Sequence, residues 1–203
     1  RVDRRQRQMC IRDSTYTVQN LERLGVSAVV IEDKKGLKKN SLFGTDVKQE
    51  QDSIENFCEK IKVGINSKQT DEFMVIARIE SLILGKGIED ALLRGRSYAD
   101  SGANGVLIHS KDKSEELVFQ FVEDFKKDFD VPVIVVPTTY NHITLDEFKK
   151  LGVDIVIYAN HLLRSAYPAM LNTAEEILKF GRTQELEKKL MSVKEVINFI
   201  PSD

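Results

Sequence analysis

Three segments of the chain repeat one pattern, in which an amphipathic helix leads through a glycine into a short apolar run closed by a polar residue. The segments are residues 24–32, 101–109 and 151–158. Glycine commonly ends helices because it adopts the left-handed conformation without strain. Uninterrupted apolar runs are typical of strands buried on both faces of a parallel sheet. Together with the apolar runs 73–77 and 133–136, the pattern predicts five parallel strands in an α/β fold.

The architecture we expect is a (β/α)8 TIM barrel rather than an open, doubly wound sheet. A doubly wound sheet usually has a glycine-rich turn after its first strand, which this sequence does not show. The segment Gly85-Lys86-Gly87 is too short for a phosphate-binding loop and predicts a turn before a helix near Ile88. A closed barrel has eight strands and typically about 250 residues. We therefore predict a truncated barrel with about five strands present, its front strands missing, and helices at its C-terminus.

The helices are indicated by the period of their apolar residues and by capping signals. One helical face is formed by apolar residues at helical spacing, namely Leu117, Val118, Phe121, Val122 and Phe125. Thr144 with Glu147 matches a capping box, which predicts the start of a helix. Ser192 with Glu195 repeats this box near the C-terminus. We expect helices over about residues 162–180 and again after Ser192.

Residues 1–14 differ from the rest of the chain. They contain five arginines and two aspartates and show no helical or strand period. We interpret them as a non-native leader that resembles translated sequencing-adapter read-through, and residues 15–203 as one partial-barrel catalytic domain. Removing these charges changes the formal net charge from −2 to −5. No basic stripe then remains to bind nucleic-acid phosphates, so we expect no nucleic-acid partner. A basic arm is the alternative interpretation of residues 1–14.

Neither a membrane nor an oxidising compartment is indicated by the sequence. No apolar run approaches the roughly 20 residues that a membrane-spanning helix needs, and no secretory signal is recognisable. The two cysteines, Cys10 and Cys58, are too few for a disulfide framework. We therefore expect a cytoplasmic protein with no membrane partner.

Chemically active side chains close three of the predicted strands: Glu32, Arg78 and His109. Active sites of parallel barrels lie at the carboxyl ends of the strands. A carboxylate can hold a divalent metal or its waters, an arginine can bind a phosphate or carboxylate with two hydrogen bonds, and a histidine can donate to a phosphoryl oxygen. The alternative is structural, with Glu32 and Arg78 as an ion pair at the rim and His109 as a strand cap. We favour a shared site because the three residues close different strands.

Residues 32–42 form a cationic segment with four lysines, a glycine and Asn40 near its tip. The segment directly follows a strand end at the catalytic side of the predicted barrel. This position predicts a lid that closes over the barrel mouth and keeps water from a charged phosphoryl group. A solvated surface loop is the alternative interpretation of the lysines.

At these residues the chain resembles the phosphoenolpyruvate mutase branch of the isocitrate lyase and phosphoenolpyruvate mutase superfamily, from about Tyr16 to Ile200. The stretches that carry the resemblance are Glu32-Asp33-Lys34 through Asn40-Ser41, Ala77-Arg78-Ile79-Glu80, Ser101-Gly102-Ala103 to Ile108-His109-Ser110-Lys111, Val136-Pro137-Thr138-Thr139-Tyr140, Ile157-Tyr158-Ala159-Asn160-His161 and Ser192-Val193-Lys194-Glu195-Val196. The resemblance implies interconversion of phosphoenolpyruvate and phosphonopyruvate, which forms the carbon–phosphorus bond of phosphonate biosynthesis. It also implies Mg²⁺ as cofactor, a small phosphorylated or phosphonate keto acid as substrate, and a homo-oligomer.

The same resemblance implies roles for individual residues. The candidates are Asn40, Arg78 and His109 as catalytic residues, Ser41, Lys38 and Ser110 as substrate-binding residues, and Glu32 as a magnesium ligand through water. Arg78 and His109 would hold the phosphoryl or carboxylate group, and Asn40 would cover the migrating phosphoryl group. A metaphosphate-like transition state needs positioning and charge stabilisation more than proton transfer, which suits hydrogen-bond donors without a strong nucleophile.

Two related activities and one inactive state are the alternatives. Carbon–carbon lyases of the superfamily carry a cysteine in the lid, whereas Cys58 lies beyond the lid on the following predicted helix. Phosphonopyruvate hydrolases tend to have threonine where this chain has Asn40, so hydrolysis is the closest alternative. The family's Asp-x-Asp magnesium motif, backbone oxyanion loop and a further catalytic aspartate have no counterpart in this sequence. An inactive barrel fragment with an exposed strand edge is therefore a further hypothesis.

Overall fold

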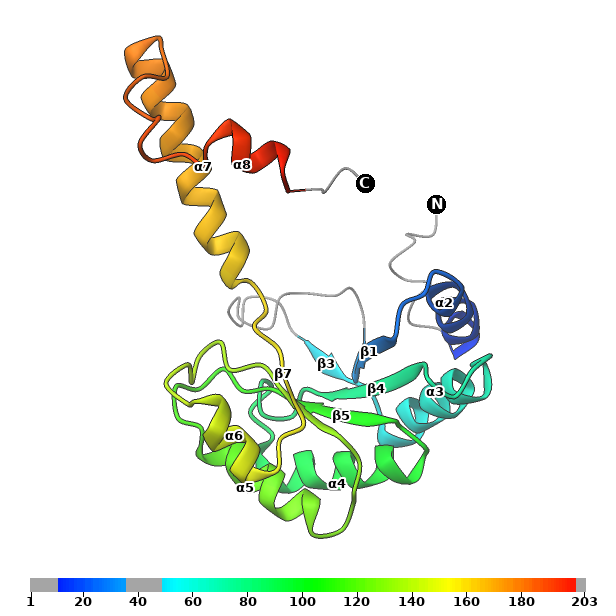
Figure 1. Ribbon diagram of the computed structural model, residues 1–203. Helices are drawn as coiled ribbons and strands as arrows, with labels where there is room; N and C mark the ends of the chain where they lie inside the picture. The colour runs from blue at the N-terminus through cyan, green and yellow to red at the C-terminus, as the bar shows by residue number, and fades with distance from the viewer. Residues whose placement is uncertain (1–10, 36–48, 200–203) are drawn as a thin grey trace. The chain divides into compact units, whose positions relative to one another are not determined.

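The five apolar runs form the strands of one sheet in the computed structural model, which describes residues 11–35 and 49–199 (Figure 1). Neighbouring strands are parallel in the order β1-β4-β5-β6-β7, which confirms the predicted sheet. The strands are β1 (Ala28–Glu32), β4 (Met74–Ile79), β5 (Gly105–Ile108), β6 (Val133–Val135) and β7 (Ile155–Val156). Among the described residues, β1 and β7 form the two edges of this sheet.

The register of the strands aligns their carboxyl ends at one edge of the sheet. Glu32 lies opposite Arg78 in the neighbouring strand. Ile79 of β4 lies opposite Ile108 of β5, the residue directly before His109. Because parallel strands run in the same direction, the polar residues that close them lie on the same side of the molecule. The sheet therefore brings together the strand ends that the sequence singled out.

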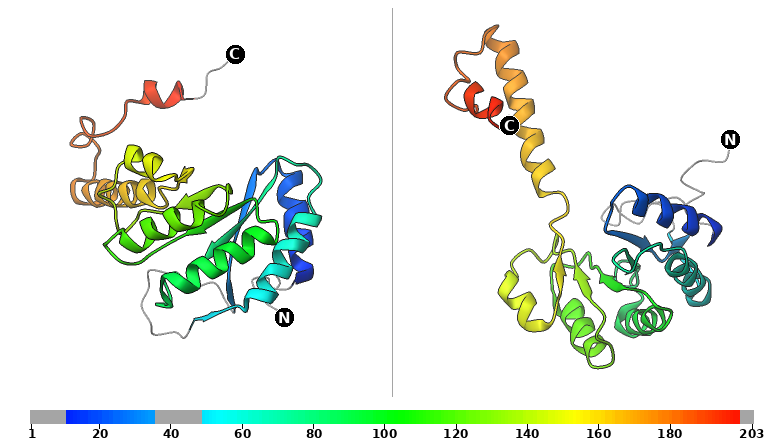
Figure 2. Two further views of the ribbon diagram at one scale, coloured as in Figure 1. Left: turned by 90° about the horizontal axis from the view of Figure 1, so that it is seen from below. Right: turned by 45° about the vertical axis from the view of Figure 1, so that its right-hand side comes forward.

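Helices cover one face of the sheet in the unit that extends to Tyr158. They are α2 (Ile11–Arg23), α3 (Ile54–Asn66), α4 (Gly87–Asp100), α5 (Glu116–Lys126) and α6 (Leu145–Leu151). Figure 2 shows α3, α4 and α5 running along the same side of the strands. In α5, Val118 and Phe125 are buried with the other apolar residues of the predicted face, and Leu117 packs against them. The capping box of Thr144 and Glu147 starts α6 as predicted.

Alternate residues of the strands face two different apolar clusters. Val106 and Ile108 of β5 pack into the larger cluster together with helix residues such as Phe121. Leu107 joins a smaller cluster with Ile134 on the opposite face of the sheet. Successive side chains of a strand point to opposite faces, so burial on both faces requires an apolar residue at every position. This requirement explains why the strands appear in the sequence as uninterrupted apolar runs.

A two-stranded antiparallel ribbon follows β1 and was not predicted. It consists of β2 (Lys34–Lys35) and β3 (Glu50–Gln51), with Lys34 opposite Gln51. Strands of two residues carry too little pattern to be recognised from sequence. In the sequence, β2 comes before residues 36–48 and β3 comes after them. These residues contain most of the predicted lid and lie outside the described residues.

The first described helix begins inside the segment that we set apart as a leader. Helix α2 starts at Ile11, and Ser14 is buried. The helix is anchored by Val18, which is fully buried against Phe73 and Val75. Residues 1–10 lie outside the described residues, so the leader interpretation stays a prediction.

The residues from Ala159 onward form a second compact unit. Its helices are α7 (His161–Phe180) and α8 (Val193–Ile197), in agreement with the predicted C-terminal helices. The capping box of Ser192 and Glu195 starts α8. The assignment of residues 15–203 to one catalytic domain stays a prediction. Neither α7 nor α8 contains a buried residue. No helix in the described part of the chain is long and apolar enough to cross a membrane.

Candidate functional site

Four charged side chains meet where β1 and β4 end, and we call Glu32, Lys34, Arg78 and Glu80 the charge cluster. Arg78 places Nη1 3.2 Å from a carboxylate oxygen of Glu32 and donates a hydrogen bond from Nε to Glu80. Lys34 Nζ lies 2.8 Å from Glu80 and 3.5 Å from Glu32. Arg78 and Glu80 are two residues apart in extended chain, so their side chains point to the same face. Each cation thus contacts both carboxylates.

Glu80 is fully buried and remains charged because it is paired. Burial alone would raise the pKa of its carboxyl group. The charges and hydrogen bonds of Arg78 and Lys34 outweigh this effect and hold the pKa below its usual value. The ion pair between Glu32 and Arg78, named above as the structural alternative, is present. It is compatible with a binding role, because an anionic ligand can replace a carboxylate as the partner of an arginine.

His109 lies directly after β5 and is buried beside the charge cluster. Burial lowers the pKa of its imidazole to about 4, and the positive charge of Arg78 acts in the same direction. Glu80 and a main-chain hydrogen bond at Val136 partly oppose the shift. The imidazole is therefore neutral at pH 7. Its Nδ1 atom has no hydrogen-bond partner among the described residues, which leaves a buried polar atom available to a ligand.

Ser110, a predicted substrate-binding residue, is buried next to His109. Its hydroxyl oxygen accepts a hydrogen bond of 3.1 Å from the amide of Asp112, and its carbonyl oxygen accepts one of 3.0 Å from the hydroxyl of Thr139. These contacts tie the loop after β5 to the loop after β6. The role of Ser110 in substrate binding stays a prediction.

Beneath the charge cluster lies a buried polar network that sequence reasoning missed; we call Asp33, Gln51, Arg94 and Tyr98 the Asp33 network. The Asp33 carboxylate accepts hydrogen bonds of 2.7 Å from the Tyr98 hydroxyl and 2.8 Å from Gln51 Nε2. Arg94 Nη1 lies 3.2 Å from the same carboxylate oxygen. Burial raises the pKa of Asp33, and these donors partly offset the rise. A signal was present in the spacing of Arg94 and Tyr98, which are four residues apart and share one helix face.

The predicted site residues divide into two groups. The structure brings Glu32 and Arg78 into contact and places His109 close enough for the charge of Arg78 to shift its pKa. Lys38, Asn40 and Ser41 lie outside the described residues. The predicted convergence at one rim is therefore observed for three residues, and the chemical roles remain predictions.

Magnesium was expected from the resemblance, with Glu32 acting through water. Among the described residues, no group of three or more His, Cys, Asp or Glu side chains is placed to hold a metal ion. Glu32 and Glu80 have the carboxylate oxygens that magnesium prefers, but both contact cations. The donor type of Glu32 therefore fits an outer role, whereas the number of described ligands does not fit a complete magnesium site.

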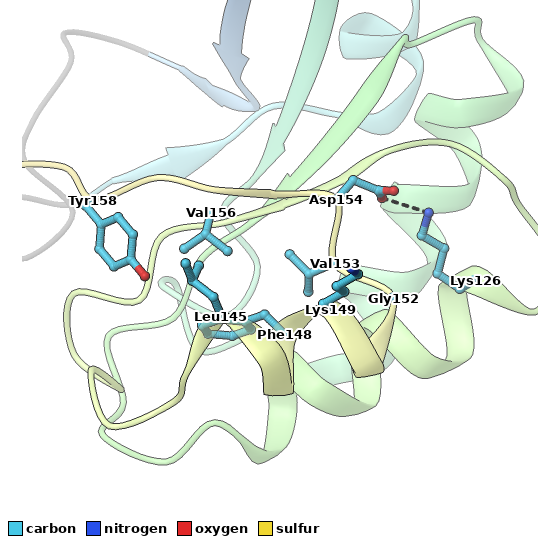
Figure 3. Close-up of a pocket in the computed structure, with 9 residues that line it drawn as sticks. All are labelled: Lys126, Leu145, Phe148, Lys149, Gly152, Val153, Asp154, Val156 and Tyr158. Carbon is cyan, nitrogen blue, oxygen red and sulfur yellow. Dashed lines mark ion pairs between the residues drawn. The ribbon is translucent and has the colours of Figure 1, made fainter.

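A surface pocket of about 720 Å³ lies away from these residues, between α6 and the edge strand β7 (Figure 3). Its walls include Leu145, Phe148 and Tyr158, and an ion pair of 2.8 Å joins Lys126 to Asp154 at its rim. No residue of the charge cluster lines it. We place the candidate site at the charge cluster, because titratable groups that lie close together and have shifted pKa values indicate a functional site better than the volume of a cavity does.

A family model and individual proteins of known sequence match most of this chain. A family model described as phosphoenolpyruvate phosphomutase matches residues 10–178. The phosphoenolpyruvate phosphomutase of Tetrahymena pyriformis is 38% identical over 92% of this chain and 61% of its own length. The phosphonopyruvate hydrolase of Variovorax sp. (strain Pal2) is 39% identical over 90% of this chain and 62% of its own length. The chain therefore spans about three-fifths of the length of these relatives.

Solved structures give the same result. A phosphoenolpyruvate phosphomutase from Streptomyces platensis subsp. rosaceus superposes with a TM-score of 0.87 at 40% identity, covering 92% of this chain and 64% of the other. A phosphonopyruvate hydrolase in complex with oxalate and Mg²⁺ superposes with a TM-score of 0.82 at 36% identity, covering 92% and 63%. The five-stranded sheet is thus the corresponding part of the barrel fold of these enzymes, which confirms the predicted truncated barrel.

Proposed function

The chain belongs to the phosphoenolpyruvate phosphomutase family, and on that premise we propose that the protein interconverts phosphoenolpyruvate and phosphonopyruvate. The observation that carries the proposal is the convergence of Glu32, Arg78 and His109 at the carboxyl edge of three adjacent strands. The reaction moves a phosphoryl group within one molecule. The bond from phosphorus to the enol oxygen breaks, and a bond from phosphorus to carbon forms.

The chemistry of the cluster suits such a transfer. The guanidinium group of Arg78 can bind a phosphoryl or carboxylate group with two hydrogen bonds. His109 is neutral at pH 7 and has an unpaired Nδ1 among the described residues, so it can hydrogen-bond to the substrate without adding a charge. Phosphoryl transfer through a loose transition state depends on positioned donors more than on a nucleophile.

The cationic segment completes the proposal. Lys38, Asn40 and Ser41 would cover the phosphoryl group and exclude water, as the resemblance implies. Exclusion of water separates the rearrangement from hydrolysis, because a metaphosphate-like group reacts with any water that reaches it.

We include magnesium in the proposal, with Glu32 contributing through a water molecule. A bound magnesium ion would neutralise charge on the pyruvate portion of the substrate. The phosphonopyruvate hydrolase structure with oxalate and Mg²⁺ supports this choice. The remaining ligands would come from outside the described residues. A homo-oligomeric, cytoplasmic enzyme is part of the same proposal.

Phosphonopyruvate hydrolysis is the second candidate function. It is favoured by the 39% identity to the hydrolase of Variovorax sp., which is as high as the identity to the mutase relative. Both reactions would use the same contacts to hold a phosphonate keto acid. They differ in whether water reaches the phosphorus atom, and Asn40 favours the mutase in our proposal.

The two functions are separated by supplying phosphonopyruvate and magnesium to the purified chain and following phosphorus by ³¹P NMR. Formation of phosphoenolpyruvate supports the mutase, and formation of orthophosphate with pyruvate supports the hydrolase. An unchanged phosphonopyruvate signal contradicts both functions for this chain. Arg78→Lys should lower turnover by about 100-fold, because a lysine cannot form two parallel hydrogen bonds. Arg96→Lys, at an exposed ion pair with Asp128, is the matched control and should leave turnover unchanged.

A further inference from the structure

Asp33 is a fully buried aspartate that the proposed reaction does not use. It stands between Glu32 and Lys34, two members of the charge cluster. Its amide donates a hydrogen bond of 3.1 Å to the carbonyl oxygen of Arg78, and its carboxylate accepts one of 3.0 Å from the amide of Glu80. Asp33 therefore fixes the end of β4 on both sides of Ile79.

The carboxylate of Asp33 also joins elements that are distant in sequence. Tyr98 and Arg94 reach it from α4, and Gln51 reaches it from the ribbon strand β3. The carbonyl oxygen of Asp33 accepts a hydrogen bond of 2.8 Å from the amide of Asp52. One side chain and its peptide groups thus connect the end of β1, the end of β4, the ribbon and a helix.

Asp33 and its two neighbours reach different groups of side chains. Asp33 lies at a bend between β1 and β2. Its carboxylate is held in the Asp33 network, whereas the side chains of Glu32 and Lys34 contact Arg78 and Glu80 of the charge cluster. The amide of Glu80 is held by the Asp33 carboxylate while its own carboxylate is held by Lys34.

We propose that Asp33, Arg94 and Tyr98 are positioning residues that lock the backbone under the charge cluster, so that Lys34 and Glu80 hold Arg78 in a fixed geometry. The catalytic part of this inference rests on the proposed function. The structural part does not, because it concerns the order of the backbone at β1, β4 and the ribbon.

Tyr98→Phe tests the proposal with little change in packing, since the ring that packs against Phe57 is retained. It removes one donor to Asp33 and one acceptor from Arg94. Tyr140→Phe is the matched control, because Tyr140 is equally buried. Among the described residues, no group lies at the distance and angle needed for a hydrogen bond to the Tyr140 hydroxyl. Gln51→Met, which removes the hydrogen bonds from Gln51 Nε2 to the Asp33 carboxylate and to the Ser81 hydroxyl, is the second variant should Tyr98→Phe fold poorly.

Hydrogen exchange measured by mass spectrometry reports the order of each segment. Tyr98→Phe should reduce the protection of the segments containing Glu80 and Asp52 by about tenfold or more, which corresponds to the loss of one hydrogen bond to a charged group. The segment of β5 around Val106 should keep its protection. Gln51→Met should also reduce protection in the same two segments, and Tyr140→Phe should leave both unchanged. Equal loss in every segment, or no loss at Glu80, overturns the proposal.

Turnover of phosphonopyruvate by the same variants tests the catalytic part. Tyr98→Phe should lower kcat by about tenfold and leave KM within about twofold, because the donors to the substrate remain present but are less well fixed. A rise in KM with unchanged kcat contradicts a positioning role. If the unmodified chain turns over no phosphonopyruvate, the proposed function fails, and the exchange measurement alone decides whether Asp33, Arg94 and Tyr98 lock the backbone.

Discussion

Replacing His109 with glutamine should remove a specific pH dependence of stability. The imidazole has a pKa of about 4 in the folded protein against an ordinary value of 6.5, chiefly because it is buried. A group whose pKa is lower in the folded protein than in the unfolded chain stabilises the folded state at pH values above its pKa in the unfolded chain. This stabilisation is lost as the pH falls through the pKa of the folded protein. The difference of about 2.5 pKa units, at 1.36 kcal/mol per unit, corresponds to about 3 kcal/mol lost between about pH 7 and pH 4.

Urea unfolding followed by circular dichroism at about pH 7.5, 5.5 and 4 measures this loss. The stability of the unmodified chain should fall relative to His109→Gln by about 3 kcal/mol over that range, since glutamine does not titrate. The difference between the two chains, rather than either curve alone, isolates His109 from the carboxylates that also titrate in acid. His142→Gln, at an exposed histidine, retains His109 and should follow the unmodified chain. Parallel curves for the unmodified chain and His109→Gln would refute the buried, neutral imidazole.

Three further predictions concern stability. Glu80→Gln should destabilise the protein by about 3 kcal/mol at neutral pH, because Lys34 and Arg78 lose a buried partner. The stability difference between the two chains should shrink as the pH falls below about 4.5. The pKa of Glu80 is lowered in the folded protein, so the stability that its carboxylate contributes is lost in acid. Urea titrations at two pH values check both parts, and a constant deficit would contradict them. Gly95→Ala should destabilise the protein by about 1 kcal/mol, because the new methyl group would lie 3.0 Å from the Phe121 ring. Gly64→Ala, whose methyl group would lie 3.5 Å from Val75, should be neutral or stabilising by up to about 1 kcal/mol. Equal effects of the two substitutions in thermal unfolding would be inconsistent with this packing. Thr144→Ala should lower the free energy of unfolding by about 1 kcal/mol through loss of the capping box, and an unchanged melting temperature would count against it.

The sheet was predictable because its physical requirements appear directly in the sequence. Strands buried on both faces need apolar residues at each position, and the runs around Val106 and Val133 satisfy that requirement. Parallel direction then follows from the helices between the runs, and it places Glu32, Arg78 and His109 at one edge. The approximate location of the site could therefore be derived from strand ends alone.

The partners of these residues could not be predicted in the same way. Lys34 and Glu80 are charged residues near strand ends, where a solvated position is the usual expectation, and no period distinguishes a buried pair from an exposed one. Asp33 and Arg94 are 61 residues apart and meet through the packing of α4 against the sheet. Contacts of this kind depend on tertiary geometry, which a local pattern does not contain.

The balance of charge in the cluster has a kinetic consequence. Two carboxylates and two cations sum to zero, so these four side chains produce little long-range field outside the protein. An anionic molecule approaching through solution would gain no acceleration from them, and their contribution to its association rate would be insensitive to ionic strength. Under the proposed function, attraction would begin at contact, when the arriving anion would take the place of a carboxylate beside Arg78.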